Sequence, residues 1–122
     1  MIADLNVTGG FAYIAARLLD VNPATKTETL VARGVYRIDR NAPDGLQLFQ
    51  LNPNGWHFAA GHVAKLELLG QDSPYARPSN GVFSISVSKL ELRLPVHEVP
   101  GSRGTPPVVK KPLPVVTPKP MR

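Results

Sequence analysis

Apolar and polar residues alternate most regularly between positions 63 and 88 of the chain. Two runs, 63–69 and 82–88, carry a polar residue at nearly every second position, and the loop GQDSPYARPSNG joins them. Because successive side chains of a strand point to opposite faces, this pattern predicts a sheet with one buried and one solvent-exposed face. We therefore expect an all-β chain, an antiparallel jelly-roll-like β-sandwich followed by a disordered proline-rich C-terminal tail.

The last predicted strands show a change in the parity of their apolar positions. Apolar residues occupy odd positions in 82–88 and even positions in 90–94, as Phe83, Ile85 and Val87 and then Leu90, Leu92 and Leu94. A regular strand cannot change parity without turning its core face to water, so a bulge or break is predicted near Ser88 and Lys89. Such a step is typical of a strand that passes from one sheet of a sandwich to the other.

Three further strands are predicted in the first half of the chain, at 11–20, 29–38 and 46–51. The first contains helix-favouring alanine, leucine and arginine. Its aromatic residues, the glycine pair before it and the Asn-Pro turn after it favour a strand instead. Gly34 lies inside the second of these strands, where a glycine indicates a bulge or the close approach of another backbone segment.

Composition and charge divide the chain into two regions. Of the 122 residues, 43% are hydrophobic, which suits one small domain, assigned to 1–98. Residues 1–100 hold nine basic and nine acidic side chains, whereas the last 22 residues hold five basic ones and no acid. This tail, 99–122, is rich in proline, which favours polyproline II or disorder. A neutral domain and the lack of a long apolar run predict neither nucleic acid nor membrane as a partner.

The residue patterns of common catalytic sites are missing from the sequence. There is no cysteine, no G-x-S-x-G turn, no G-x-x-x-x-G-K-[ST] loop and no H-E-x-x-H helix. His57 and His62 suggest a two-histidine metal site, but no acid stands at ligand spacing. A turn at Gly61-His62, with the imidazole hydrogen-bonded to nearby backbone, is favoured. We predict no catalytic residue, metal or cofactor, and no activity from this chain alone.

Candidate binding residues are found in one loop and at one tryptophan. The loop GQDSPYARPSNG offers Asp72, Tyr75, Arg77 and Asn80 on a proline-braced frame. These side chains either form a contact surface or order the loop itself. Trp56 is the only tryptophan. It either stacks on a sugar or caps an open end of the sandwich, and capping is favoured because a lone large aromatic residue is usually buried.

Four segments stand in a characteristic order, FAYIAARLLDV, LVARGVYR, WHFAAGHVAKLELLG and PYARPSNGVFSISVSKLELRLP. Together they resemble the C-terminal β-sandwich of the X-prolyl dipeptidyl-peptidase and cocaine-esterase group of serine hydrolases. The resemblance implies a galactose-binding-like jelly roll with Gly61 and His62 at the family's Gly-His turn and Asp20 at the end of its "DV" strand. The family domain has further strands before the equivalent of Phe11, so an N-terminally incomplete domain is implied.

The function that this resemblance implies is that of a non-catalytic accessory domain. In the family, the domain packs on an α/β-hydrolase catalytic domain that cleaves ester or X-prolyl peptide bonds, and it helps to shape the substrate entrance. We expect that partner in the same or a separate chain, and homo-oligomer contacts are also compatible with the resemblance. The family's catalytic residues lie in the hydrolase domain, so none is assigned here. Phe11, Trp56 and Tyr75 are the expected contact residues.

Two other functions remain open from the sequence. One is a free-standing carbohydrate-binding module with a cleft around Trp56 and Asn80, although an aromatic content of 7% is low for a stacking surface. The other is a structural protein that docks a partner through its tail. The tail has no two prolines in P-x-x-P spacing, which favours a plain flexible segment.

Overall fold

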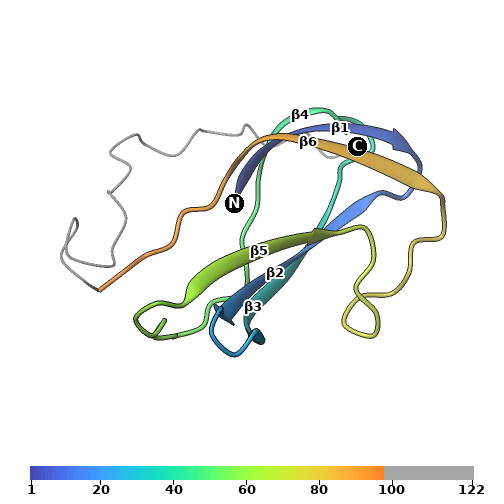
Figure 1. The fold of residues 1–122 in the computed structure, drawn as a ribbon. Coiled ribbons are helices and arrows are strands. Elements are labelled where there is room, and N and C mark those ends of the chain that lie inside the picture. Colours follow the sequence, from blue (N-terminus) through green and yellow to red (C-terminus); the bar gives the residue numbers. More distant parts are fainter. Residues whose placement is uncertain (98–122) are drawn as a thin grey trace.

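The computed structural model describes residues 1–97 as six strands joined by loops. The strands are β1 (Ile2–Gly9), β2 (Tyr13–Asn22), β3 (Thr27–Arg37), β4 (Gly45–Leu48), β5 (Val63–Leu69) and β6 (Phe83–Glu91). They form two antiparallel three-stranded sheets, sheet A in the order β4-β1-β6 and sheet B in the order β3-β2-β5 (Figure 1). The prediction of an all-β chain with two sheets is confirmed. The predicted tail, 99–122, lies outside the described residues.

β1 is the central strand of sheet A, and it precedes the first strand that the sequence analysis predicts, at 11–20. Ala3 and Leu5 on its inner face are 0% and 2% exposed, and the strand pairs with both β4 and β6. The run is short and ends in two glycines, so it is easily taken for an irregular N-terminal segment. Its signal is the alternation of Ala3, Leu5 and Val7 with polar residues.

β6 contains the irregularity that the change of parity predicts. Ile2 of β1 pairs with Glu91 and Asp4 pairs with Ser88, so β6 has one extra residue between these two pairs. Lys89 there has a φ of 51°, in the left-handed region. The predicted bulge is confirmed, but the predicted passage to the other sheet is wrong. The strand continues in sheet A as far as Glu91 because the bulge itself absorbs the change of parity.

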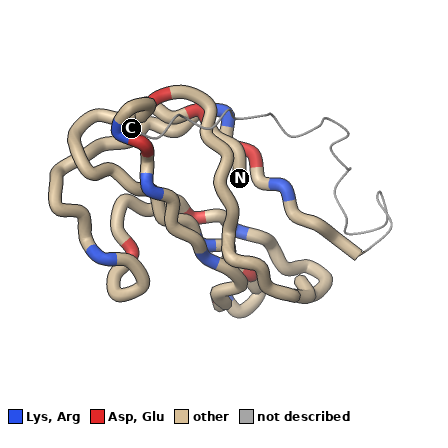
Figure 2. Tube along the Cα trace, turned by 180° about the vertical axis from the view of Figure 1, so that it is seen from behind, with Lys and Arg blue, Asp and Glu red and all other residues tan. Residues whose placement is uncertain are grey.

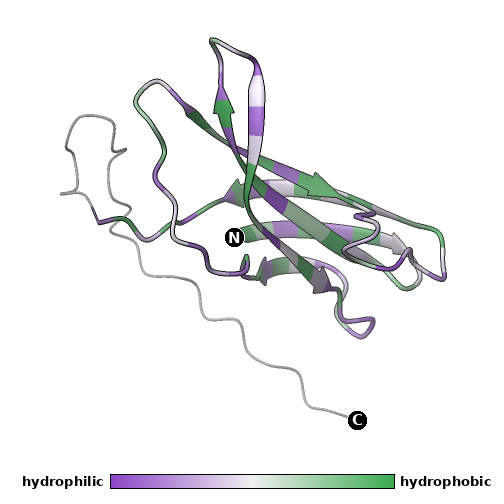
Figure 3. Ribbon diagram, turned by 90° about the horizontal axis from the view of Figure 1, so that it is seen from below, coloured by the Kyte–Doolittle hydropathy of each residue, from purple (hydrophilic) through white to green (hydrophobic). Residues whose placement is uncertain are grey.

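β2 is the central strand of sheet B and is buried on both faces. On each face its apolar side chains are at most 7% exposed, Ile14, Ala16 and Leu18 toward sheet A and Tyr13, Ala15 and Leu19 on the other side. Figure 3 shows how hydrophobic and hydrophilic residues alternate along the strands. The predicted strand at 11–20 is therefore confirmed, and its nearly continuous apolar content reflects burial on two faces.

Two clusters of buried apolar side chains fill the space between the sheets. They are Met1, Ile14, Ala16 and Phe49, and Ala3, Leu5, Ala12 and Ile38. Tyr36 packs against both clusters. Its ring stacks on Phe49 with 5.1 Å between centroids, and its hydroxyl donates to Gln47 Oε1 at 2.8 Å. This hydrogen bond between β3 and β4 satisfies a buried amide and closes one side of the sandwich.

The outer edge of β3 is covered by the loop that follows β4. The backbone N–H of Asn52 donates to the Arg33 carbonyl at 2.9 Å, and the side-chain Nδ2 of Asn54 donates to the Val31 carbonyl at 2.6 Å. These bonds occupy acceptors that would otherwise be open to pairing with another chain.

Gly34 is a point of close backbone approach, as the sequence indicates. A Cβ added at Gly34 would lie 2.8 Å from the carbonyl oxygen of Gln50. The strand is not bulged at this glycine. The irregularity of the β2–β3 pair lies instead between Leu18 and Leu19. The glycine is therefore explained by the covering loop, which needs the room that a side chain would take.

The opposite side of the sandwich is open. β5 and β6 are the edge strands on this side, one in each sheet. Between them is an apolar cleft of about 230 Å³, lined by Ile14, Leu68, Leu69, Gly70, Phe83, Ile85 and Val87. The two sides of the molecule are thus unlike, one closed by a loop and a hydrogen bond and the other with apolar residues at its mouth.

Candidate functional site

The outer face of sheet B, turned away from sheet A, carries exposed apolar side chains. Leu30 and Val35 of β3 and Val63 of β5 are 41%, 43% and 53% exposed. Each pairs across the sheet with an apolar residue of β2 on the same face. We call these three residues the outer apolar patch, and the row of Arg17 and Arg33 lies between Val35 and Leu30. An antiparallel sheet commonly has one apolar and one polar face, so apolar side chains on a second face indicate a contact surface.

A buried carboxylate fastens the loop 70–82 onto this outer face. Asp72 is 2% exposed, and its Oδ1 accepts hydrogen bonds from Arg17 Nε at 3.2 Å and Arg33 Nη2 at 3.3 Å. Arg17 Nη2 also donates to Oδ1, and Arg33 Nη2 lies 3.3 Å from Oδ2. Of the two roles that the sequence leaves open for this loop, Asp72 fills the second, since its carboxylate is buried, paired with two arginines of the sheet, and orders the loop.

The charges of this cluster stabilise one another. The hydrogen bond from Arg17 holds the pKa of Asp72 below its ordinary value of 3.8, and Arg33 acts in the same direction, although burial opposes the shift. The same hydrogen bond raises the pKa of Arg17, and its cross-strand neighbour Glu67 adds to this shift. The carboxylate therefore stays ionised at neutral pH, and the loop is held by charge-assisted hydrogen bonds.

Tyr75 joins the loop 70–82 to the loop that covers β3. The guanidinium carbon of Arg33 lies 4.4 Å from the centre of its ring, and its hydroxyl accepts a hydrogen bond from Asn52 Nδ2 at 2.7 Å. The Tyr75 side chain remains 40% exposed, and Arg77 and Asn80 are exposed on the same loop. Asp72 and Tyr75 thus order the loop, while Tyr75, Arg77 and Asn80 present a surface to solvent.

A second buried carboxylate, Asp20, lies near the end of β2 and is 6% exposed. Trp56 Nε1 donates to its Oδ2 at 2.9 Å, and His62 Nδ1 lies 2.7 Å from its Oδ1. Burial acts to raise the pKa of Asp20, but the bonds from Trp56 and His62 outweigh it and hold the pKa below 3.8. Gly61, with a φ of 84°, is part of the predicted turn, which the His62 amide closes on the Ala59 carbonyl. The imidazole bonds to a carboxylate, which corrects the expected backbone partner.

Trp56 and Asn80 lie at opposite ends of β2. Trp56 contacts Asp20 near the end of the strand, whereas Asn80 follows Ser79, whose hydroxyl donates to the Phe11 carbonyl before the strand begins. A strand rises about 3.3 Å per residue, so these ends are roughly 25–30 Å apart. The single cleft around Trp56 and Asn80 that a carbohydrate-binding module would need is therefore not formed.

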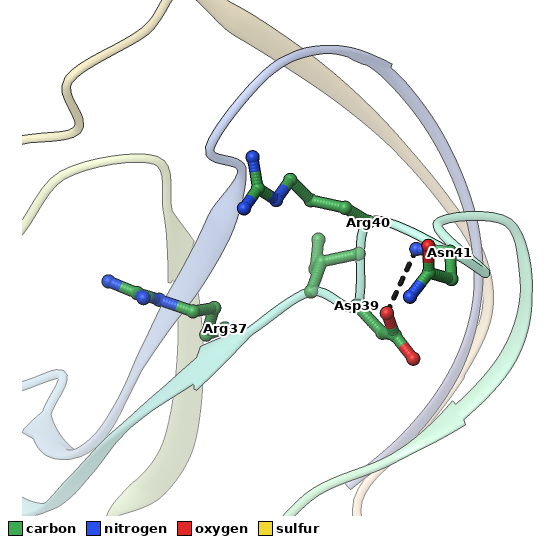
Figure 4. Close-up of a pocket in the computed structure, with 5 residues that line it drawn as sticks. Arg37, Asp39, Arg40 and Asn41 are labelled. Carbon is green, nitrogen blue, oxygen red and sulfur yellow. Dashed lines mark hydrogen bonds between the residues drawn. The ribbon is translucent and has the colours of Figure 1, made fainter. Parts of the chain in front are cut away.

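Phe11 stands in the turn before β2, with a φ of 58° and a side chain that is 52% exposed. The guanidinium carbon of Arg40 lies 5.0 Å from the centre of its ring. Residues 37–41, Arg40 among them, line a pocket. In it the backbone N–H of Asn41 donates to Asp39 Oδ1 at 2.9 Å (Figure 4). A bulky residue with positive φ is strained, so surrounding contacts must hold this turn. The expected contact residues therefore lie apart, Phe11 at one end, Trp56 at the other and Tyr75 over the outer face.

Residues 1–97 also provide information about metal-binding groups, charged surfaces and membrane-spanning helices. They contain no group of three or more His, Cys, Asp or Glu side chains that could hold a metal ion. Basic and acidic residues are interspersed along this part of the chain (Figure 2), and none of its segments is a helix suited to crossing a membrane. No known family model, curated protein or solved structure matches the chain. The outer face of sheet B is therefore the best basis for assigning a function.

Arg17 and Arg33 are the site residues that the sequence analysis misses. Both interrupt otherwise apolar strand segments, Arg17 between Ala16 and Leu18 and Arg33 within the LVARGV run. A charged side chain inside an apolar strand segment needs a partner where it is removed from water, and this requirement is the signal that identifies them. Their partner could not be chosen from the sequence, because several acidic residues were equally available.

Proposed function

We propose that this chain is a non-catalytic accessory domain of a serine hydrolase and that it packs on the α/β-hydrolase domain through the outer face of sheet B. In this proposal the domain is a galactose-binding-like jelly roll, and the parent enzyme cleaves ester or X-prolyl peptide bonds. The observation that carries the proposal is the outer apolar patch, which lies beside a loop fastened by ion pairs to the buried Asp72 carboxylate.

The patch supplies a driving force for association. Leu30 and Val35 are roughly half-exposed in the chain as described. Removing the exposed part of such a side chain from water contributes about 1 kcal/mol, so a few such residues and a polar rim suit an interdomain contact. Arg77 and Tyr75 lie on the neighbouring loop and provide the polar and aromatic groups that are typical of such a rim.

The loop 70–82 supplies shape without proton transfer. Asp72 and Tyr75 already fix it to the sheet, so little conformational entropy is lost when a second domain binds against it. A pre-ordered loop at a domain boundary can form one wall of a substrate entrance. The accessory domain would then influence which substrates enter the hydrolase pocket without contributing a catalytic group.

The coding sequence upstream of Met1 provides the first test. An α/β-hydrolase sequence in the same reading frame is the expected result, and it would supply the partner domain for binding experiments. An in-frame stop codon, with no hydrolase that binds the chain in trans, would contradict the proposal.

The second test compares two charged substitutions at apolar residues of matched exposure. Val35→Lys is placed on the outer face of sheet B, and Leu46→Lys is placed on β4 of sheet A, where Leu46 is 44% exposed. Val35→Lys is expected to loosen the contact with the hydrolase domain, seen as faster limited proteolysis between the domains, and to change the KM for large esters. Leu46→Lys should change neither. Equal effects of the two variants, or no effect of Val35→Lys, would rule out this face as the contact.

A further inference from the structure

The outer edge of β5 is open to pairing. In sheet B, β5 pairs with β2 on one side only, and no other segment of residues 1–97 donates or accepts a backbone hydrogen bond along its second edge. The β3 edge, by contrast, is covered by Asn52 and Asn54, and β4 is only four residues long. An uncovered seven-residue edge strand is a template for another strand, and proteins commonly protect such edges.

The sequence of β5 is self-complementary when read in the antiparallel direction. The strand is VAKLELL, centred on Leu66. Positions at equal distances from this centre are matched in chemistry, Lys65 with Glu67, Ala64 with Leu68 and Val63 with Leu69. In a two-fold symmetric antiparallel pair, these are the residues that stand opposite each other across the two copies.

We propose that two copies of this chain associate by antiparallel pairing of β5 with β5, in the register that places Leu66 opposite Leu66. Lys65 of each copy then faces Glu67 of the other, which gives two cross-strand ion pairs related by symmetry. Val63, now 53% exposed, is covered by Leu69 of the second copy. Apolar and opposite-charge pairs across neighbouring strands both stabilise a sheet.

The position of Lys65 on the strand suits this role. Its ammonium lies 2.8 Å from Glu28 Oε1, which keeps the side chain extended over the outer face of sheet B. Glu28 lies on β3, across β2 from β5, so Lys65 exchanges this partner for Glu67 of a second copy when the two strands pair. Lys65 and Glu67, two positions apart on β5, therefore present one positive and one negative charge on the same face of the strand.

Pairing in this register also covers the apolar cleft. The cleft opens on the side of β5 and β6, and Leu68 and Leu69 contribute to its wall. In an antiparallel β5 pair with two-fold symmetry, the inner faces of both copies lie on the same side of the joined sheet. The clefts of the two copies therefore open toward each other across the β5 pair. The open side of each sandwich thus faces the other copy instead of water.

This inference does not rest on the proposed function. Of the outer apolar patch, the β5 pair covers Val63, whereas Leu30 and Val35 lie on β3, at the far edge of sheet B, and remain available to another domain. Loss of one contact leaves the other intact, so failure of either proposal can be recognised separately.

Sedimentation equilibrium of the 122-residue chain is the direct test. The monomer mass is 13.2 kDa. The mass should rise toward twice that value with a dissociation constant of about 10–100 μM, as suits a small interface. A mass that stays at 13.2 kDa up to about 1 mM would overturn the proposal.

Charge reversals then test the register. Lys65→Glu and Glu67→Lys each place like charges opposite one another twice per dimer and should weaken self-association at least about fivefold. The double variant restores both ion pairs with reversed polarity and should dimerise like the original chain. Mixing the two single variants should give a heterodimer, because one carries two acids and the other two bases. Glu67→Lys also places a positive charge opposite Arg17 in place of a negative one, which can weaken the fold. Circular dichroism must therefore first show that each variant folds.

Val35→Lys serves as the matched control, since it adds a charge to the same face of sheet B on β3 and should leave self-association unchanged. Dimers that are insensitive to the single reversals, or that the double variant and the mixture fail to restore, would place the interface elsewhere and overturn the proposal.

Discussion

Arg17 and Arg33 stand directly opposite each other on β2 and β3, and both guanidinium groups contact the same carboxylate, Asp72. Like charges at directly opposed positions repel, so the pair by itself would weaken the sheet. The loop carboxylate reverses this effect because it is buried between the arginines. The ordering of the loop and the stability of the sheet therefore depend on the same three side chains.

Replacement of Asp72 by asparagine should both destabilise the domain and release the loop. The variant leaves two partly buried arginines without their counter-charge, and we expect the melting temperature to fall by at least about 5 °C. Amide hydrogen exchange within residues 70–82 should become faster than in β2. Asp39→Asn is the matched control, because Asp39 is exposed and contacts only its own turn among the described residues. An unchanged melting temperature for Asp72→Asn would contradict the role assigned to the cluster.

Acid should unfold the protein through its two buried carboxylates. The pKa values of Asp72 and Asp20 are held below the ordinary value of 3.8 in the folded chain. The folded state thus binds fewer protons than the unfolded state, so the stabilisation is fully present above that value. It is lost as the pH falls through the lower folded pKa values. Urea unfolding at a series of pH values should show this decrease, and Asp72→Asn should make it shallower. An increase in the free energy of unfolding as the pH falls below about 4 would contradict this prediction.

The single tryptophan offers a spectroscopic test of the Asp20 cluster. Trp56 donates to the Asp20 carboxylate and is 43% exposed. Asp20→Asn keeps the size of the side chain but replaces a charge-assisted hydrogen bond with a weaker neutral one. We expect a change in the Trp56 emission maximum and stronger quenching by acrylamide. His62→Gln, which removes the second partner of Asp20, should give a smaller change in the same direction. Identical emission in the original chain and Asp20→Asn would argue against the contact.

Gly34 should be intolerant of even a methyl group. A Cβ at this position would meet the Gln50 carbonyl oxygen at 2.8 Å, and a backbone atom cannot swing aside as a side chain can. Gly34→Ala is expected to lower the free energy of unfolding by about 1–3 kcal/mol. Gly55→Ala is the control, since a Cβ there meets nothing within 4 Å. Its effect should stay within about 0.5 kcal/mol. Chemical denaturation of both variants decides whether the covering loop requires the glycine.

Local alternation of residue types was enough to determine five of the six strands, β2 to β6, and one of their irregularities. The serines of β6 face out and Phe83, Ile85 and Val87 face in, as a period of two requires, and the change of parity predicted the irregularity near Lys89. β1 shows the limit of this approach, because a short alternating run of small residues carries a weak signal. Such patterns are properties of neighbouring residues, so they can be read without knowledge of the rest of the fold.

Only the tertiary structure decided which charged and polar residues meet. Arg17 and Asp72 are 55 positions apart, and Asp20 and His62 are 42 apart. Their contacts depend on the register of β2 with its neighbours and on the path of two loops, neither of which the alternation of residues encodes. For this reason the sequence leaves open whether Asp72 forms a contact surface or orders its loop, and only the structure shows it buried. Strand formation follows from local chemistry, whereas pairing of distant charges follows from which segments the packed sheets bring together.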